Sequence, residues 1–417
     1  MSAITAILIG AGLRGEIYAG YALRYQDELK IIGVAEPDPE RRERFKAQHN
    51  INDENCFESW EELLSKPKMA DAAIICTQDR MHFEPTMKAM ELGYEILLEK
   101  PMSSDPKECI RLGSYANEHN RILNICYVLR YTPFFMTLKK LLRSGKIGRL
   151  ISVQHNENVG YWHMAHSFVR GNWSNSDRSS SMILQKCCHD MDILRWLIGA
   201  DCTNISSFGE LTHFKADNAP EGAPLRCLDG CKHKNECAYY APKLYLTEET
   251  DWPTSAISND SSYEARYKAL KEGPYGRCVY HCDNNVVDHQ VVTMEFANSV
   301  TVAFTMCAFT NEISRTIKLM GTEGEIRAAM EKGEIEIKNF STGNVEVIRL
   351  PEEKTGHCGG DDGIMMDFVS LVRSGKSDAG YGIDESVHSH LMAFAAEKAR
   401  LEKKIINMEK YANEFGQ

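Results

Sequence analysis

The sequence lacks the features of a membrane, exported or nucleic-acid-binding protein. None of its apolar runs approaches the roughly 18 residues that a transmembrane helix needs. No basic segment precedes the first apolar run, so we expect a cytoplasmic protein without a secretory signal. The net charge of −11 provides no basic surface for phosphate groups, which argues against a nucleic-acid partner. The chain also has no internal repeat and no low-complexity tract.

The sequence does contain enough apolar residues to form more than one hydrophobic core. At 417 residues with 43% apolar content, two or three domains are expected. In residues 1–126, short apolar runs alternate with helical patterns such as Pro39–His49 and Glu84–Leu92. The runs are Ile4–Ile9, Ile31–Ala35, Ala72–Cys76, Ile96–Leu98 and Ile122–Tyr127. This alternation predicts an α/β domain with a doubly wound parallel sheet.

The remaining residues, 127–417, have a different pattern, which predicts an α+β domain with a large, mostly antiparallel open sheet. Its strand-like runs follow one another closely: Leu150–His155, Val286–Phe296, Val300–Phe304, Ile313–Met320, Glu325–Ala328, Glu334–Lys338 and Val345–Leu350. Helical patterns return at Ile364–Arg373 and Glu385–Lys410. Residues 215–282, rich in Cys, Pro, Gly and Tyr, are expected to be an insertion.

Gly10, Gly12 and Gly15 form the pattern G-x-G-x-x-G between the first apolar run and a helical pattern. Glycines at this spacing allow a tight turn and a close approach of the backbone to a pyrophosphate, which the helix N-terminus faces. Glu36 ends the next strand, where a carboxylate accepts hydrogen bonds from ribose hydroxyls and repels a 2′-phosphate. The pattern therefore predicts a Rossmann domain that prefers NAD to NADP; the alternative is a glycine turn without a cofactor.

A lysine follows the fifth apolar run, in Leu98-Glu99-Lys100-Pro101. Ligands of open parallel sheets bind beyond the carboxyl ends of the strands, which places Lys100 beside a nicotinamide ring. Pro101 restricts Lys100 to an extended backbone. We expect Lys100 to bind a substrate hydroxyl or to take part in proton transfer; the alternative is a solvent-exposed lysine at the end of a strand.

A second group of polar residues lies beside a predicted buried helix face. That face consists of Leu184, Cys187, Cys188, Met191, Leu194 and Ile198. Gln185, His189 and Asp192 form a stripe beside it, and Lys186 and Asp190 are spaced as an i, i+4 pair. Oxidation of an alcohol needs a group that takes the hydroxyl proton, and histidine titrates near neutrality. His189 is therefore a candidate catalytic residue; a structural histidine is the alternative.

The insertion contains Cys227, Cys231 and Cys237, followed by Cys278 and Cys282. In a chain without an export signal, metal ligation or packing is favoured over a disulfide framework. Four thiolates would form a closed tetrahedral zinc site, with Cys282 as the alternative to Cys278. An iron–sulfur cluster, packed free thiols and a disulfide remain open. A bound metal would help to fold an insertion that has little core of its own.

These motifs together resemble the Gfo/Idh/MocA family, named for glucose-fructose oxidoreductase and inositol dehydrogenase. The matching segments occur in family order over nearly the whole chain: Gly10–Gly15, Glu36-Pro37-Asp38, Thr77-Gln78-Asp79 with His82, Glu99-Lys100-Pro101, Arg130-Tyr131, Gly145–Gly148, His189 with Asp192, and Asp384–Lys403. The resemblance implies a two-domain enzyme with tightly held NAD(P), with Lys100 and His189 as the catalytic pair. It also implies a homodimer or homotetramer.

The resemblance assigns roles to further residues. It implies a cofactor-binding set of Gly10, Gly12, Leu13, Arg14, Gly15, Glu36, Thr77, Gln78, His82, Glu99 and Lys100. The substrate-binding candidates are Arg130, Tyr131, His163, His166, Arg170 and Asp192. Two positions depart from the family pattern: Gln185 replaces a common Asp, and Gln78 replaces a common Pro after Thr77. The adjacent Lys186 would add a second cation, so Gln185 and Lys186 join the catalytic candidates.

The leading hypothesis is an NAD-dependent oxidoreductase that transfers hydride between nicotinamide and a hydroxyl-bearing carbon of a sugar, polyol or glycoside. One alternative is an NAD-dependent enzyme that cleaves glycosides through a transient keto-sugar. Another, from a different class, is a non-catalytic NAD-binding regulatory protein, although Lys100 and His189 are both present.

Overall fold

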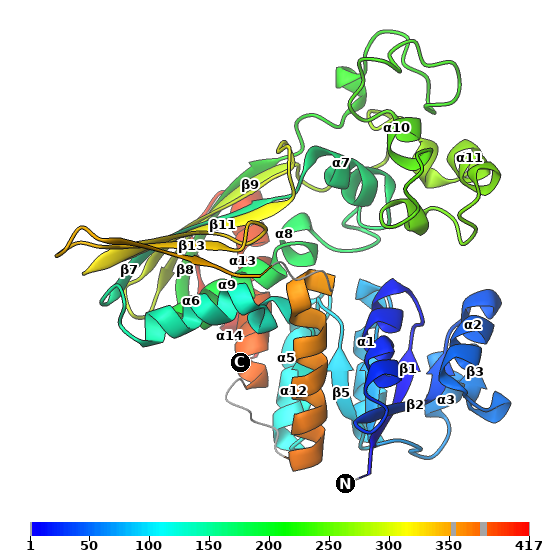
Figure 1. Cartoon of the computed structure of the whole chain (residues 1–417), viewed down its shortest axis with the longest axis horizontal. Coiled ribbons are helices and arrows are strands. Elements are labelled where there is room, and N and C mark those ends of the chain that lie inside the picture. Colours follow the sequence, from blue (N-terminus) through cyan, green and yellow to red (C-terminus); the bar gives the residue numbers. More distant parts are fainter. Residues whose placement is uncertain (1, 352–355, 376–381, 417) are drawn as a thin grey trace.

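The computed structural model describes residues 2–351, 356–375 and 382–416. They form two sheets with their helices, and the first sheet lies in the N-terminal part of the chain (Figure 1). Among these residues, no helix is both long and apolar enough to cross a membrane.

The N-terminal sheet is parallel throughout, with strand order β3-β2-β1-β4-β5-β6. Its strands are β1 (Ile4–Ile9), β2 (Leu29–Ala35), β3 (Cys56–Phe57), β4 (Ala72–Ile75), β5 (Glu95–Leu98) and β6 (Leu123–Ile125). The central strands read as nearly continuous apolar runs because helices cover both faces of a parallel sheet. This strand order is that of a doubly wound sheet, and the predicted fold class is confirmed.

The covering helices are α1 (Leu13–Arg24), α2 (Pro39–His49), α3 (Trp60–Leu64), α4 (Phe83–Glu91) and α5 (Pro106–Glu118). A sixth, α12 (Gly360–Ser374), comes from far along the chain and lies beside the N-terminal elements (Figure 1). Its Ile364 and Phe368 are buried in one cluster with Ala6 and Leu8 of β1. The C-terminal part of the sequence therefore contributes a helix to the N-terminal core.

The second sheet has the order β14-β13-β12-β11-β7-β10-β9-β8-β15, and only β10 and β7 pair in parallel. Its strands are β7 (Leu150–Asn158), β8 (Cys202–Glu210), β9 (His289–Phe296), β10 (Thr301–Cys307), β11 (Ser314–Gly321), β12 (Gly324–Ala329), β13 (Glu334–Asn339), β14 (Val345–Arg349) and β15 (Ile406–Asn407). Strict alternation in β9 buries Val292 and Met294 and exposes Val291 and Thr293. One face of this sheet packs on helices, and the other is exposed in the monomer.

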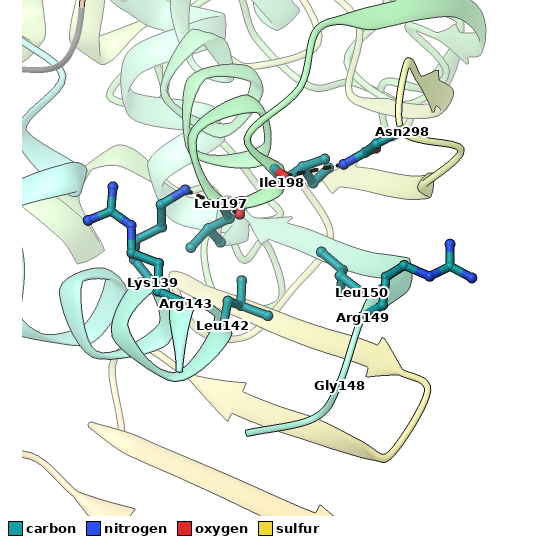
Figure 2. A pocket seen from close by; sticks show the side chains of 9 residues that line it. All are labelled: Lys139, Leu142, Arg143, Gly148, Arg149, Leu150, Leu197, Ile198 and Asn298. Atoms are coloured by element: carbon teal, nitrogen blue, oxygen red, sulfur yellow. Dashed lines mark hydrogen bonds between the residues drawn. The ribbon is translucent and has the colours of Figure 1, made fainter. Parts of the chain in front are cut away.

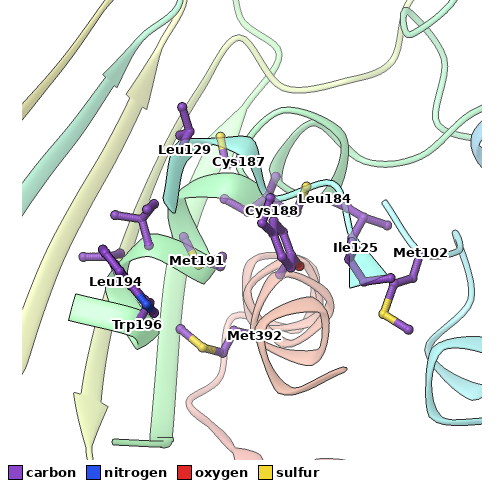
Figure 3. Close-up of a cluster of buried hydrophobic side chains, with 14 of the residues drawn as sticks. Met102, Ile125, Leu129, Leu184, Cys187, Cys188, Met191, Leu194, Trp196 and Met392 are labelled. Carbon is purple, nitrogen blue, oxygen red and sulfur yellow. The ribbon is translucent and has the colours of Figure 1, made fainter. Parts of the chain in front are cut away.

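The helices of this part are α6 (Pro133–Arg143), α8 (Met182–Gln185), α9 (Cys188–Ile198), α13 (Ile383–Glu402) and α14 (Met408–Asn413). The face predicted between Leu184 and Ile198 is buried, and Cys187 and Cys188 pack within it (Figure 3). The helix pattern is interrupted at Lys186–Cys187, where α8 ends and α9 begins. Lys186 pairs with Glu157 of β7 instead of with the predicted partner Asp190.

Two predictions of secondary structure were wrong. The helix expected over residues 385–410 ends at Lys403, which takes a left-handed φ of +53°, and a short strand and α14 follow. The sequence analysis also missed β8, because polar residues dominate its sequence CTNISSFGE. Pairing with β9 along its whole length stabilises this strand, and that pairing is not visible in a local pattern.

The insertion carries α10 (Ala241–Tyr245) and α11 (Tyr263–Glu272), near α7 (Tyr161–His163). All three lie on the side of the Rossmann domain that the carboxyl ends of its strands face (Figure 1). The insertion has a small cluster of its own, in which Cys227, Ala241, Tyr245 and Leu270 are the buried members.

Candidate active site

The glycine turn connects β1 to α1. Gly10 has a φ of +92°, and a Cβ there would lie 2.7 Å from the carbonyl oxygen of Cys76. A Cβ on Gly15 would lie 2.1 Å from the carbonyl oxygen of Gly10, so both positions require glycine. In contrast, nothing lies within 4 Å of a Cβ built on Gly12, which caps α1 without a side-chain hydrogen bond. The turn is open where a pyrophosphate would approach the N-terminus of α1.

Glu36 follows β2 and is almost fully buried. Its carboxylate accepts hydrogen bonds from the backbone N–H of Ala11 at 2.8 Å and of Asp38 at 3.0 Å. The nearby Arg42 donates to the carbonyl oxygen of Glu36 and pairs with Glu58 at 3.3 Å. The carboxylate is thus held beside the glycine turn, and Arg42 is engaged within the protein instead of facing a 2′-phosphate.

Arg14 and Glu99 form an ion pair at 2.7 Å, next to this turn. Arg14 also pairs with Asp361 of α12 at 2.7 Å, and Tyr18 donates to Glu99 at 3.0 Å. Burial opposes the ionisation of Glu99, but the charges of Arg14 and Lys100 outweigh it and lower the pKa of Glu99. Both side chains join β5, α1 and α12 internally, and their contact with the cofactor stays a prediction.

The loops after β4 and β5 are joined by His82. Its Nδ1 lies 2.6 Å from the carbonyl oxygen of Pro101, and its Nε2 lies 3.0 Å from that of Thr77. The hydroxyl of Thr77 donates to the carbonyl oxygen of Met81 at 3.0 Å, and Gln78 is exposed. These residues shape the carboxyl edge of the sheet, where the cofactor was predicted.

Lys100 reaches from this edge to the second part of the chain. Its Nζ donates to the backbone carbonyl oxygen of Gln185 at 2.9 Å. The backbone N–H of Lys100 donates to the Glu99 carboxylate at 2.5 Å. Gln185 is a buried residue of α8. The structure therefore brings two predicted catalytic residues together across 85 positions of sequence.

His189, in the first turn of α9, is buried with 7% of its surface exposed. Its Nδ1 is buried without a hydrogen-bond partner, and its ring meets Tyr127 edge-on, with the centroids 6.1 Å apart. Burial, followed by the positive charge of Lys100, lowers the pKa of His189 well below its usual range. The imidazole is consequently unprotonated at neutral pH.

A chain of buried charges runs from α8 and α9 to the second sheet. Lys186 pairs with Glu157 of β7 at 3.1 Å, and Glu157 pairs with Arg315 of β11 at 2.6 Å. Arg315 continues to Asp190 at 2.9 Å, and Asp190 accepts from His155 at 2.8 Å. Burial opposes the ionisation of Asp190, but the charge of Arg315 outweighs it and lowers the pKa of Asp190.

His155, Glu157 and Arg315 were not predicted as site residues, although the pattern of β7 indicated two of them. His155 and Glu157 continue the alternation of the buried Val153 along β7, so they are polar residues at core positions. His357, which precedes α12, was also not predicted. It contacts Asp361, and its ring centroid lies 6.3 Å from that of His189. Nothing local to His357 indicates this placement.

The predicted substrate residues Arg130 and Asp192 are paired with each other. Arg130 Nε donates to Asp192 at 2.7 Å in a buried, two-pronged ion pair, and Ser389 donates to the same carboxylate at 3.3 Å. Tyr131 donates to Asp367 of α12 at 2.7 Å. Arg130 and Tyr131 thereby fasten α9 and α12 to the segment that follows β6, and the contact of all three residues with substrate stays a prediction.

His163, His166 and Arg170 follow β7 in a helical segment beside the insertion. His166 Nδ1 lies 2.8 Å from the Tyr245 hydroxyl, and Arg170 donates at 2.7 Å to carbonyl oxygens of Arg277 and Tyr239. Those two side chains therefore hold the insertion. The ring of His163 instead packs against Trp252, with the centroids 5.1 Å apart.

Two cavities lie away from Lys100 and His189, and Arg170 lines the second of them. One, of about 330 Å³, is lined by side chains of α6, β7 and α9 that include Lys139 (Figure 2). Lys139 Nζ lies 3.4 Å from the carbonyl oxygen of Leu197 at the end of α9, and burial lowers its pKa to about 8. The other cavity, of about 20 Å³, is lined by Cys227, Cys231, Cys237 and Cys278.

The parallel sheet, the glycine turn and Glu36 define an NAD-binding Rossmann protein, and comparisons with known proteins identify its family. Residues 4–127 match the family model described as "Oxidoreductase family, NAD-binding Rossmann fold". Residues 139–407 match the model "Oxidoreductase family, C-terminal alpha/beta domain". The chain therefore belongs to the Gfo/Idh/MocA family of oxidoreductases, as its motifs predicted.

Individual relatives agree with this assignment. The chain is 22% identical over 413 residues to a Bacillus subtilis protein named as an oxidoreductase, YteT, with 93% of both chains covered. It is 28% identical over 218 residues to inositol 2-dehydrogenase 4 of Saccharopolyspora erythraea, which covers 52% of this chain and 59% of that protein.

Among solved structures, levoglucosan dehydrogenase in complex with NADH and L-sorbose aligns with a TM-score of 0.73 and 16% identity, covering 98% of this chain and 99% of that one. An oxidoreductase from Agrobacterium radiobacter, in complex with NAD+, L-tartaric acid and magnesium, aligns with a TM-score of 0.71, 13% identity and the same coverage. At these identities the structural likeness establishes the fold.

Proposed function

We propose that the protein is an NAD-dependent dehydrogenase of a sugar, polyol or glycoside. The observation that carries this proposal is the neutral, buried imidazole of His189, whose Nδ1 has no partner, close to Lys100 at the carboxyl edge of the cofactor sheet. An alcohol oxidation needs a base and a hydroxyl-binding cation at this place.

The residues present fit NAD. The open side of Gly12 suits a pyrophosphate, and the Glu36 carboxylate beside the turn suits a ribose diol and opposes a 2′-phosphate. When bound, NAD supplies the acceptor for the hydride that leaves the carbinol carbon. Leu13 begins α1 next to the turn and is exposed, so it is available to contact the cofactor.

The chain's own residues handle the proton. Lys100 binds the reacting hydroxyl and holds its oxygen while the C–H bond breaks. His189 takes the hydroxyl proton, and in the reverse direction it returns that proton to the carbonyl oxygen. Lys186, held by Glu157, adds a second positive charge near His189. Gln185 acts through its backbone by fixing the Lys100 side chain.

An aromatic group near Lys186 and the names of relatives support this substrate class. His163, Trp162 and Trp252 form an aromatic group, and the charge of Lys186, after burial, contributes to the lowered pKa of His163. Aromatic faces beside charged groups suit a polyhydroxylated ring. Relatives named inositol dehydrogenase and levoglucosan dehydrogenase act on molecules of this type. In this proposal Arg130, Tyr131, His166, Arg170 and Asp192 position these elements.

The buried Lys186–Glu157 pair favours one second candidate, the cleavage of glycosides through a transient keto-sugar. There the oxidation acidifies the neighbouring C–H, a base removes that proton, and the glycosidic C–O bond breaks as its oxygen takes up a proton. Water then adds to the new C=C bond, and the hydride returns to the carbonyl carbon, so that the sugar is released with no net redox change. Glu157 is a buried carboxylate beside Lys186 to which the simple dehydrogenase reaction gives no chemical step.

One experiment tests both functions. Purified protein is incubated with NAD and a panel of inositols, sugars and glycosides, while NADH absorbance and free-sugar release are measured in parallel. NADH formation supports the dehydrogenase, and sugar release without net NADH supports cleavage. Neither signal with any polyol, despite measurable NAD binding, would refute both.

We also propose that two or more copies associate through the exposed face of the second sheet. Phe208 and Val291 are paired neighbours on β8 and β9, and both are exposed in the monomer. Burial of such a face stabilises a homo-oligomer. Light scattering that gives the mass of a single chain at micromolar concentration would refute this.

A further inference from the structure

The insertion contains a group of cysteines that the dehydrogenase reaction does not use. Cys227, Cys231, Cys237 and Cys278 line the same cavity of about 20 Å³. Two segments far apart in sequence meet there, because Arg226 and Arg277 form an isolated antiparallel bridge. On either side of it, Cys227 N–H donates to the Gly276 carbonyl oxygen and Cys278 N–H to that of Leu225, both at 2.9 Å.

The surroundings of Cys227 suit a sulfur that accepts hydrogen bonds. The backbone N–H of Ala241 lies 3.5 Å from its Sγ, and the buried guanidinium of Arg170 lies 3.6 Å from it. The guanidinium of Arg170 beside this sulfur offsets part of the negative charge that several thiolates would bring together.

Four thiols line the cavity, and four thiolates make the closed tetrahedral set that a structural zinc ion takes. Cys282 is not among the lining residues: its thiol donates to the carbonyl oxygen of Cys278 at 3.3 Å, and it packs against the main core. The candidate set is therefore the four cysteines that line the cavity.

The insertion needs additional stabilisation. Within its own cluster, the buried residues are Cys227, Ala241, Tyr245 and Leu270. Segments of this size with so small a core commonly rely on metals or disulfides. The described cysteines form no disulfide, so a bound metal would add to the anchoring that His166 and Arg170 provide.

We propose that Cys227, Cys231, Cys237 and Cys278 bind one structural zinc ion that fixes the insertion over the active site. As the side chains stand, no group of three or more His, Cys, Asp or Glu in the described residues is arranged to hold a metal. Binding thus requires the thiols to turn inward, and each turns about a single Cα–Cβ bond. Tetrahedral thiolate coordination then replaces the small core.

The test uses the full-length chain, purified without a polyhistidine tag or added metal. Elemental analysis should find about one zinc per chain. Cys231→Ser and Cys237→Ser should each lose it, whereas Cys282→Ser, the matched control in the same insertion, should keep it. Zinc retained by both ligand variants, or iron in its place, would overturn the proposal.

A second measurement on the unmodified protein does not depend on the folding of variants. A zinc chelator should release the metal and expose the insertion to proteolysis between residues 228 and 275, while the Rossmann domain stays intact. Thiol titration in denaturant should count all 14 cysteines as reduced. A metal-free protein, or a count of two fewer thiols, would overturn the proposal; neither result bears on the dehydrogenase assignment.

Discussion

Replacing His189 by alanine should remove most of the activity and leave the fold nearly intact. The Nδ1 atom of this ring has no hydrogen-bond partner, so the substitution orphans no group there, and the ring mainly loses packing against Tyr127. A cost of about 1–3 kcal/mol in unfolding free energy is expected for such a truncation. Loss of a positioned base lowers the rate by roughly 10²–10⁴-fold, which corresponds to about 3–5 kcal/mol of transition-state stabilisation.

The assay is kcat for NADH formation between pH 6 and 9, together with NAD binding followed by fluorescence. Because the pKa of His189 lies well below its usual range, the unmodified enzyme should keep its base through pH 6. The variant should lose kcat across this range, regain part of it with added imidazole, and bind NAD normally. His49→Ala is the matched control: burial lowers the pKa of His49 to about 4, but it lies on α2 away from the site. A variant at position 189 within threefold of the unmodified kcat would refute the assignment.

Four further predictions concern the cofactor, the site and the fold. Lys100→Met should lower kcat/KM by at least about 10²-fold, and Lys100→Arg should restore little, because arginine is bulkier and differently shaped. Glu36→Ala should weaken NAD binding and reduce the preference for NAD over NADP. Arg130→Met should cost about 3–5 kcal/mol of unfolding free energy, because it leaves a buried carboxylate unpaired. Burial lowers the pKa of His390 to about 4, and its ring accepts a hydrogen bond from the backbone N–H of Met102. As the pH falls, this histidine is therefore protonated in the unfolded chain before it is protonated in the folded one. The free energy of unfolding should then fall between pH 6.5 and 4, by roughly 2 kcal/mol at pH 5.

Each of these has a contradicting result. Unchanged kcat/KM in Lys100→Met would exclude it from the chemistry, and an unchanged NAD to NADP ratio in Glu36→Ala would exclude it from ribose selection. Urea unfolding that is identical in Arg130→Met and the unmodified protein would show that the pair adds no stability. A pH-stability curve equally steep in His390→Gln would assign the acid sensitivity to other groups.

The sequence predicted the elements whose signals are local. β1 and α2 have the predicted bounds, because an apolar run before a glycine turn and a capped helix are encoded within a few residues. In α2, Asp38 accepts from the Arg41 N–H at 2.9 Å and Pro39 starts the helix. β8 was missed because only its pairing with β9 makes it a strand.

The residues of the candidate site fall into the same two groups: those indicated by local motifs and those placed by tertiary contacts. Lys100 and His189 are recognisable because each lies in a motif of neighbouring residues, whereas Glu157, Arg315 and His357 come from separate strands and a distant loop. A pair such as Arg315 and Glu157 exists only through the register of β11 on β7. No spacing along the chain contains that information.

By itself, the sequence determined the Rossmann domain, its cofactor class and the family, because glycine geometry, strand ends and short motifs depend on local chemistry. The tertiary structure decided which charges meet in the buried chain from Lys186 to Asp190, that Arg170 holds the insertion, and that Cys278 rather than Cys282 faces the sulfur-lined cavity. These facts depend on contacts between segments far apart in the chain, and burial then sets the protonation of groups such as His189.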